Sequence, residues 1–284
     1  MRRFCFARSN LTTPSASPPR RRRLFVGAVV AVVALVAALV VLLVQGLGGN
    51  NHAKPATLSA VPSDVQAAMS TIPATTYEQV GVGEALTQGV PMSTGVSSAA
   101  PGKPTLLFIS AQYCPFCAGQ RWALVAALSR FGTFSGLSLS ESEEYHVATF
   151  SFLHTTFHSR YLNFVGRDVE DQTGHALQKL TPAQAHTWDT YLSAGEKAPS
   201  FPFIDFGGRY VSVNDTVDVT KLLGLPARQI ATEVREPSTS VSQTVIGAAN
   251  MFTAAICQLT NQQPASVCTA NLRFLAGQFP AYRR

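Results

Sequence analysis

Two cysteines separated by two residues, Cys114 and Cys117, are the strongest candidates for chemistry in this sequence. They lie between an apolar run at 105–109 and a helical pattern that begins at Ala118. A helix N-terminus offers unpaired N–H groups and the positive end of the helix dipole, so it favours a thiolate over a thiol. The second sulfur can then attack a mixed disulfide on the first. This arrangement is typical of a thiol-disulfide exchange site.

Within the pair, we expect Cys114 to be the exposed attacking sulfur and Cys117 to be the more buried resolving one. Pro115 suits the first helical turn, because the amide hydrogen that it lacks would have no partner there. Half of a zinc site and an inert structural disulfide are the two competing interpretations. Zinc is disfavoured because the other cysteines form no second pair at this spacing; they are Cys5, Cys257 and Cys268.

The elements that position the pair follow from the hydrophobic pattern. The run 105–110 is short and continuously apolar, which predicts a central strand buried on both faces. After Cys117, apolar residues recur at helical spacing and predict a helix that packs on the sheet and ends at Gly132. Arg121 could face the sulfurs and favour a thiolate, although a solvated arginine is the favoured interpretation.

A second informative stretch, 200–211, predicts a hairpin with a Gly-Gly turn. A proline directly before a strand needs a structural reason, and a cis Phe201–Pro202 bond would turn the backbone of residue 201 toward the dithiol. That backbone could pair with a substrate chain and hold a mixed disulfide in line. An ordinary trans proline at the start of a strand is the alternative.

The rest of the domain carries weaker signals. We expect strands at 77–82 and 145–152, a polar loop at 135–144 and helices across 155–197. Thr181 begins a capping box within that last stretch. His154 and His158 have a metal-ligand spacing on a helix, but no carboxylate or cysteine joins them in the local pattern, so we predict no metal site.

The C-terminal part, 237–284, predicts two helices. The first begins at Ser240 and carries Cys257 near its end, and Pro264 opens the second, which carries Cys268. A structural disulfide between the two cysteines is plausible across the helix-helix turn and would add roughly 3 kcal/mol by the chain-entropy model. A second redox-active pair that relays electrons is the alternative, but no helix N-terminus supports it at Cys257.

The charge of the chain is concentrated in its first residues. The 284-residue chain has a formal net charge of +6. Seven arginines lie within residues 1–23, whereas the rest of the chain has 15 basic and 16 acidic residues. The folded part is therefore near neutral, and a nucleic-acid partner is not expected.

Residues 24–44 follow this basic tail without a polar or charged side chain. A run of 21 residues can cross a bilayer core as a helix. The arginines before it orient the N-terminus toward the cytoplasm. A cleaved signal peptide is the alternative to a retained anchor. We expect a linker at 45–62 and an extracytoplasmic domain at 63–284, where disulfides persist.

The segments above resemble the thioredoxin superfamily. The predicted helical insertion at about 152–198 looks more like the DsbA-type members than thioredoxin itself. The chain also resembles, over most of residues 60–275, a membrane-anchored family called domain of unknown function 929. That resemblance rests on Gln112 to Ala118, Arg121-Trp122, Leu128 to Gly132, Phe201 to Asp205, Gly247 to Asn250 and Ala255 to Cys257.

The resemblance implies an α/β, thioredoxin-like fold with a helical insertion and C-terminal helices, preceded by one transmembrane helix. It also implies Cys114 as nucleophile, Cys117 as resolving thiol and Pro202 as a cis proline. We place the substrate-contacting residues next to these positions: Tyr113, Pro115, Phe116 and Phe201. Thioredoxin has a buried acidic residue that assists its resolving cysteine, and no position of this sequence is identified for it.

Together these features predict a membrane-anchored thiol-disulfide oxidoreductase that acts on thiols or disulfides of exported proteins, with its direction left open. The redox-active disulfide is the only cofactor expected, and a membrane redox partner would reset it. The alternative is a binding module without turnover, which would carry copper(I) between Cys114 and Cys117 or dock a partner.

Overall fold

The computed structural model describes residues 53–96, 102–191 and 200–283, which belong to a compact unit from Ala53 to Arg284. The predicted basic tail, the predicted membrane segment at 24–44 and Cys5 lie outside the described residues. Within the described ranges, no helix has both the length and the apolar character needed to cross a membrane.

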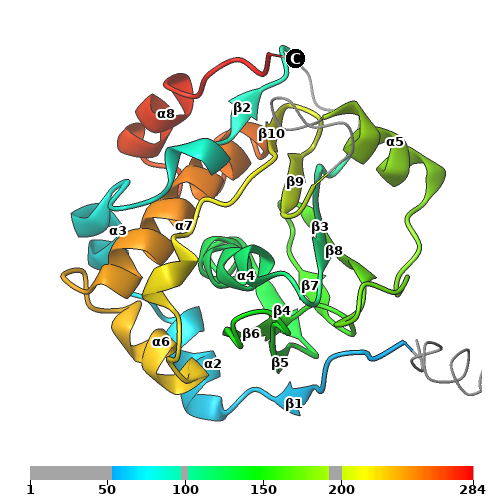
Figure 1. Cartoon of the computed structure of the whole chain (residues 1–284). Coiled ribbons are helices and arrows are strands. Elements are labelled where there is room, and N and C mark those ends of the chain that lie inside the picture. Colours follow the sequence, from blue (N-terminus) through cyan, green and yellow to red (C-terminus); the bar gives the residue numbers. More distant parts are fainter. Residues whose placement is uncertain (1–52, 97–101, 192–199, 284) are drawn as a thin grey trace, which may run out of the picture. The chain divides into compact units, whose positions relative to one another are not determined.

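A five-stranded mixed sheet forms the centre of the unit, in the order β2-β10-β9-β3-β8. Its central strand β3 pairs in parallel with β8 and antiparallel with β9 (Figure 1). The hairpin strands β9 and β10 pair antiparallel, and β10 carries β2 on its other side. The strands are β2 (Met92–Ser93), β3 (Thr105–Ala111), β8 (Asn163–Glu170), β9 (Phe203–Phe206) and β10 (Tyr210–Ser212).

Helices cover both faces of this sheet, which is why β3 is apolar at nearly every position. On one face lies α4 (Pro115–Leu128), and α7 (Ser240–Leu259) packs against it (Figure 1). On the other face, Leu107, Ile109 and Phe203 pack against Trp188 of α5 (Pro182–Thr190). The described residues therefore form a mixed α/β fold.

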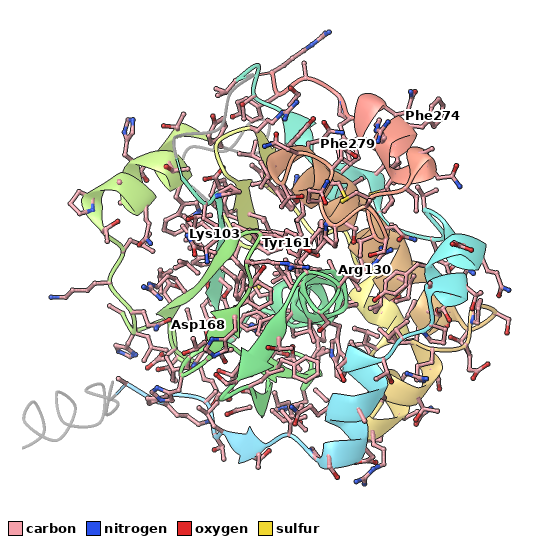
Figure 2. All side chains as sticks on the ribbon, turned by 180° about the vertical axis from the view of Figure 1, so that it is seen from behind. Lys103, Arg130, Tyr161, Asp168, Phe274 and Phe279 are labelled. Carbon is pink, nitrogen blue, oxygen red and sulfur yellow. A yellow bond between two sulfur atoms is a disulfide. The ribbon has the colours of Figure 1, made fainter. Side chains whose placement is uncertain are left out.

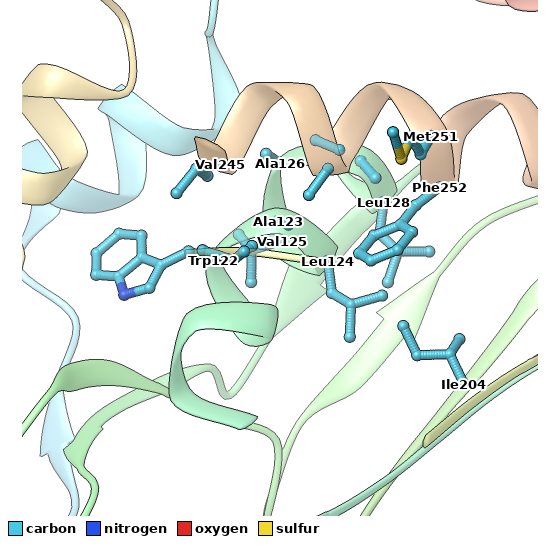
Figure 3. Packing of buried hydrophobic residues seen from close by; sticks show 14 of the residues in the cluster. Trp122, Ala123, Leu124, Val125, Ala126, Leu128, Ile204, Val245, Met251 and Phe252 are labelled. Carbon is cyan, nitrogen blue, oxygen red and sulfur yellow. The ribbon is translucent and has the colours of Figure 1, made fainter. Parts of the chain in front are cut away.

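Helix α4 is buried along almost its whole length because the sheet and α7 enclose it. Trp122, Leu124 and Leu128 are fully buried, and α7 contributes Val245 and Phe252 to the same core (Figure 3). A helix that is apolar all round is a core helix. The prediction that this helix packs on the sheet is thus confirmed, and the dithiol helix is a buried central element.

Smaller elements surround this core. A three-stranded sheet has the order β1-β5-β6, and a two-stranded one joins β4 and β7. These strands are β1 (Ser59–Ala60), β4 (Thr133–Ser135), β5 (Ser138–Glu141), β6 (Ala148–Ser151) and β7 (Thr156–His158). The remaining helices are α2 (Ser63–Ser70), α3 (Ala74–Val80), α6 (Ala227–Glu233), α8 (Ala270–Gly277) and the short 3₁₀ turns η1 (Thr87–Gly89) and η2 (Val219–Lys221).

Several predicted elements are confirmed at their positions: the central strand, the dithiol helix, the Gly-Gly hairpin and the capped helix. Thr181 accepts a hydrogen bond from the Gln184 amide at 3.3 Å, and the Gln184 side chain accepts one from the Thr181 amide at 2.9 Å. The capping box therefore forms as its spacing predicts.

Several secondary-structure predictions are wrong. Residues 74–80 form helix α3 instead of a strand, and the predicted loop at 135–144 contains β5. The supposedly helical insertion at 152–198 contains β7 and β8, and β8 is the parallel partner of β3. Its mixed sequence, NFVGRDVE, is only partly buried at this sheet edge, so the strongly apolar pattern of a central strand is absent.

Candidate active site

Cys114 is the N-cap of α4, directly after the turn that follows β3. Its extended backbone (φ −73°, ψ 117°) leads into Pro115 in the first helical turn. The Cys114 Sγ accepts a hydrogen bond from the Cys117 backbone N–H at 3.2 Å. A sulfur thus takes the capping place that a Ser or Asp oxygen usually holds, so the helix N-terminus acts directly on this thiol.

Both cysteines are buried free thiols. Cys114 is 5% exposed and Cys117 is fully buried, so the predicted order of exposure is right but the predicted exposed position of Cys114 is wrong. The reason is tertiary: Cys114 packs into the main hydrophobic core, whereas Phe116 between the two cysteines is 42% exposed. Cys114 is the thiol that lies nearer to solvent.

The two thiols have opposite pKa shifts. The hydrogen bond from the Cys117 thiol lowers the pKa of Cys114, assisted by the Cys117 backbone N–H and the positive charge of Arg121, while burial opposes them. Burial raises the pKa of Cys117 well above its usual range, and the neighbouring Cys114 sulfur raises it further. Cys114 is therefore the more acidic thiol of the pair, and Cys117 holds its proton more tightly.

Arg121 lies buried behind the thiols and is not solvated, which corrects the favoured sequence-based interpretation. Its guanidinium forms an ion pair with Asp168 at 2.6 Å and donates to Ser110 Oγ at 3.2 Å. Among the described residues no atom accepts a hydrogen bond from its Nε. Its positive charge helps to lower the pKa of Cys114 and opposes the rise in the pKa of Cys117.

Asp168 is the charged residue of this site that the sequence did not reveal. It stands on β8 opposite Ser110 of β3, whose hydroxyl donates to Asp168 Oδ1 at 2.6 Å. Because β8 was expected to be helical, no pattern placed this carboxylate near the dithiol. The one available signal was the position of Arg121, two helical turns beyond Cys114 on the face that carries the thiols.

The Phe201–Pro202 peptide bond is cis, as the sequence suggested. Pairing of β9 with β3 sets Phe203 opposite Ile109, so Pro202 stands beside the end of β3 that leads to the dithiol. The Phe201 ring makes an edge contact with Tyr113, with ring centroids 6.4 Å apart. Trp188 of α5 stacks on the same Phe201 ring, with ring centroids 5.2 Å apart.

These contacts bring the predicted substrate-binding residues to one region, but the residues differ in their exposure to solvent. Phe116 is exposed, and Tyr113 and Phe201 are half-buried. Pro115 is buried, and its predicted contact with a substrate stays a prediction. Burial, together with the nearby Glu170 carboxylate, raises the pKa of Tyr113, which keeps its hydroxyl protonated.

A turn that the sequence analysis did not single out also borders the dithiol. The Glu144 amide donates to the Tyr113 carbonyl at 3.1 Å. Tyr145 and His146 follow with φ values of 60° and 50°, a left-handed conformation that non-glycine residues rarely adopt. Tyr145 is 69% exposed. An aromatic side chain is thus presented to solvent next to the segment that carries Cys114.

The other cysteine pair lies elsewhere. Cys257 and Cys268 form the expected disulfide, which joins the end of α7 to the segment before α8. Cys268 precedes α8 rather than lying within the helix opened by Pro264, which corrects that prediction. His158 is in strand β7 and not on a helix, and the described residues contain no group of three or more potential metal ligands.

The fold and the site define a mixed α/β protein with two buried free thiols at the N-terminus of its central helix. A family model described as Domain of unknown function (DUF929) matches residues 93–258, and the chain belongs to this family. The matched segment contains β3, the dithiol, the cis proline and most of α7. No curated protein and no solved structure matches the chain.

Proposed function

We infer that the protein is a thiol-disulfide oxidoreductase that works through Cys114 and Cys117. The observation that carries this proposal is the asymmetry of the pair: the Cys114 sulfur caps a helix and accepts the Cys117 amide at 3.2 Å, while Cys117 is fully buried. A thiolate at the first position and a protonated thiol at the second are what a two-step exchange needs.

A thioredoxin-like fold is part of the same proposal. Three features support it: a central strand that leads into the dithiol, a helix that begins at the dithiol, and a hairpin strand beside them that begins after a cis proline. The parallel β8 and the antiparallel β9 on either side of β3 are consistent with it.

In the oxidising direction, a substrate thiolate attacks the Cys114 sulfur of the Cys114–Cys117 disulfide. That bond breaks, and Cys117 leaves with the electron pair and takes up a proton. A second substrate thiolate then attacks the substrate sulfur of the mixed disulfide, and Cys114 leaves as a thiolate. The substrate loses two electrons and gains a disulfide, and the protein dithiol gains the two electrons. Reduction of a substrate runs through the reverse steps.

Arg121 is proposed as a positioning residue for this exchange. Its charge stabilises the Cys114 thiolate that leaves in the second step. Stabilising the thiolate stabilises the reduced protein, which makes the dithiol a stronger oxidant. Asp168 holds the guanidinium in place through the 2.6 Å ion pair.

We further propose that residues 24–44 anchor the enzyme in the cytoplasmic membrane with its domain outside, where it would meet exported proteins and a membrane redox partner. The four arginines directly before this segment support the orientation. A thiol reagent that does not cross membranes should label the reduced Cys114 in intact cells and leave Cys5 unlabelled until lysis. Labelling of Cys5 alone in intact cells would reverse the orientation.

The reduction potential of the pair tests the enzyme proposal. Residues 53–284 would be equilibrated in glutathione buffers, alkylated and mapped by mass, so that the Cys257–Cys268 disulfide is measured separately. A potential between about −120 and −180 mV would indicate formation or shuffling of disulfides, and one near about −270 mV would indicate a reductase. If the pair does not titrate, the proposal fails.

Turnover must then depend on the attacking sulfur. Cys114→Ser should abolish insulin reduction and oxidative refolding of a reduced protein, and Cys117→Ser should trap mixed disulfides. Cys257→Ala with Cys268→Ala is the matched control, since it removes two cysteines outside the site. The binding module would be favoured instead by three results together: the protein retains one copper(I) per chain, Cys114→Ser loses it, and no turnover is measured.

A further inference from the structure

A cavity of about 520 Å³ opens at the end of α4 that is opposite the dithiol. Its walls come from α3, from the segment after it, from α7 and from α8. Pockets of about 300 to 1,000 Å³ hold small molecules in proteins. The apolar part of this lining comes chiefly from Val82, Leu272, Phe274, Leu275 and the Tyr77 ring.

Arg130 is the only arginine or lysine among the residues that line this cavity. It is half-buried, and its guanidinium carbon lies 4.1 Å from the centre of the Tyr77 ring. Its Nη1 makes a long hydrogen bond of 3.5 Å to Asn250. No carboxylate among the described residues lies within ion-pair distance of it. A cation that is partly withdrawn from water without a paired anion favours an anionic ligand.

Asn250 lines the cavity, and Gly247 lets the segment after α3 pack closely on α7. The Asn250 amide donates to the carbonyls of Tyr77 and Gly81, at 2.8 and 2.7 Å. At Gly247 a side chain would meet the Val82 carbonyl oxygen at 2.3 Å, so only glycine lets this backbone approach α7. Both residues belong to the segment Gly247 to Asn250, and the proposed dithiol chemistry does not involve this segment.

The rim of the cavity is formed by α8. Phe274 is 72% exposed there, the most exposed of the large hydrophobic side chains described (Figure 2). Figure 2 also shows Arg130 at the end of α4. Glu78, an exposed residue of α3, lines the same cavity and partly offsets the field of Arg130. The cavity is thus lined by apolar side chains, by the half-buried cation Arg130 and, at its rim, by the exposed ring of Phe274.

We propose that this cavity binds a small amphipathic acid, whose anionic group pairs with Arg130 and whose apolar body packs against α8 and Tyr77. The charge selects an acid over a neutral compound, because a guanidinium forms charge-assisted hydrogen bonds with a carboxylate, sulfonate or phosphate. This binding site is separate from the dithiol, and it does not depend on the proposed redox function.

Two fluorescent probes of similar shape test the charge requirement: anilinonaphthalene sulfonate, which is anionic, and phenylnaphthylamine, which is neutral. The native unit, residues 53–284, should bind the sulfonate at one site per chain. Arg130→Gln should weaken that binding by about tenfold or more, the factor that corresponds to about 1.4 kcal/mol of lost charge-assisted hydrogen bonding. Binding of the neutral probe should change little.

Matched variants separate loss of the site from loss of the fold. Arg273→Gln removes the same charge from α8 outside the cavity lining and should leave binding unchanged. Arg130→Lys keeps the charge and should keep most of the affinity. Ser266→Trp fills the cavity from an exposed position and should abolish binding, with an unchanged circular dichroism spectrum. Glu78→Gln should tighten binding a few-fold, because it removes the opposing charge.

Competition identifies the source of the acid. Displacement of the probe by dodecanoate below its micellar concentration would indicate a free acid, and displacement only by phosphatidylglycerol vesicles would indicate a membrane lipid. The proposal is overturned if neither competes, if both probes bind equally well, or if Arg273→Gln weakens binding as much as Arg130→Gln does.

Discussion

Arg121 lies in the middle of α4, and Arg130 lies just beyond its C-terminal end; both are partly or fully withdrawn from water. Arg121 has a carboxylate at 2.6 Å and a hydroxyl at 3.2 Å, so its charge is paired within the protein. Arg130 rests on the Tyr77 ring and a distant amide oxygen, without a carboxylate among its described neighbours at ion-pair distance. A buried cation with its own anion is part of the fold, whereas one without it is open to an outside anion.

This difference predicts unequal costs of removing each charge. Arg121→Gln leaves the Asp168 carboxylate buried without its partner, which should lower the free energy of unfolding of the reduced protein by about 3 to 5 kcal/mol. Urea denaturation followed by circular dichroism would measure it. Replacing both partners by apolar residues, as in Arg121→Met with Asp168→Leu, should recover most of the loss. A double variant no more stable than the single one would show that the ion pair is not the cause.

Removing the charge of Arg130 should lower the free energy of unfolding much less. Arg130→Gln loses a cation–π contact and a long hydrogen bond but leaves no buried carboxylate behind, so the expected loss is about 1 kcal/mol. The same denaturation experiment applies, with Arg273→Gln as the surface control. A loss as large as that of Arg121→Gln would mean that Arg130 has an internal partner and that the cavity is not open to a ligand.

The smallest effect concerns the thiolate itself. Because the pKa of Cys114 is lowered, its alkylation rate in the reduced protein should have an inflection below that of free cysteine and fall as the pH drops through it. The corresponding stabilisation of the reduced fold is present above the unfolded pKa and is lost as the pH falls through the folded pKa.

Arg121→Met with Asp168→Leu should shift this inflection to higher pH and slow alkylation at neutral pH several-fold, since one of the charges that favours the thiolate is gone. Arg130→Gln, at the far end of the helix, should leave the inflection unchanged. An identical profile for the native protein and the double variant would remove Arg121 from the account of the thiolate.

The features that the sequence predicted correctly are those set by neighbours in the chain. The dithiol and its helix, the capping box at Thr181 and the hairpin after Pro202 each depend on a few consecutive residues whose side chains or missing N–H groups act within one turn. The disulfide between Cys257 and Cys268 also closes only a short loop. Such local rules operate in the chain before it packs, so they can be read from spacing alone.

Only the tertiary structure decided which residues surround the thiols and which line the cavity. Asp168 reaches Arg121 across 47 positions because β8 pairs with β3, and Asn250 reaches Tyr77 across 173 positions because α7 packs beside α3. In neither pair does the local sequence around one residue predict its contact with the other. Long-range pairing depends on how the whole core closes, and the burial that raises the pKa of Cys117 exists only once the core has closed.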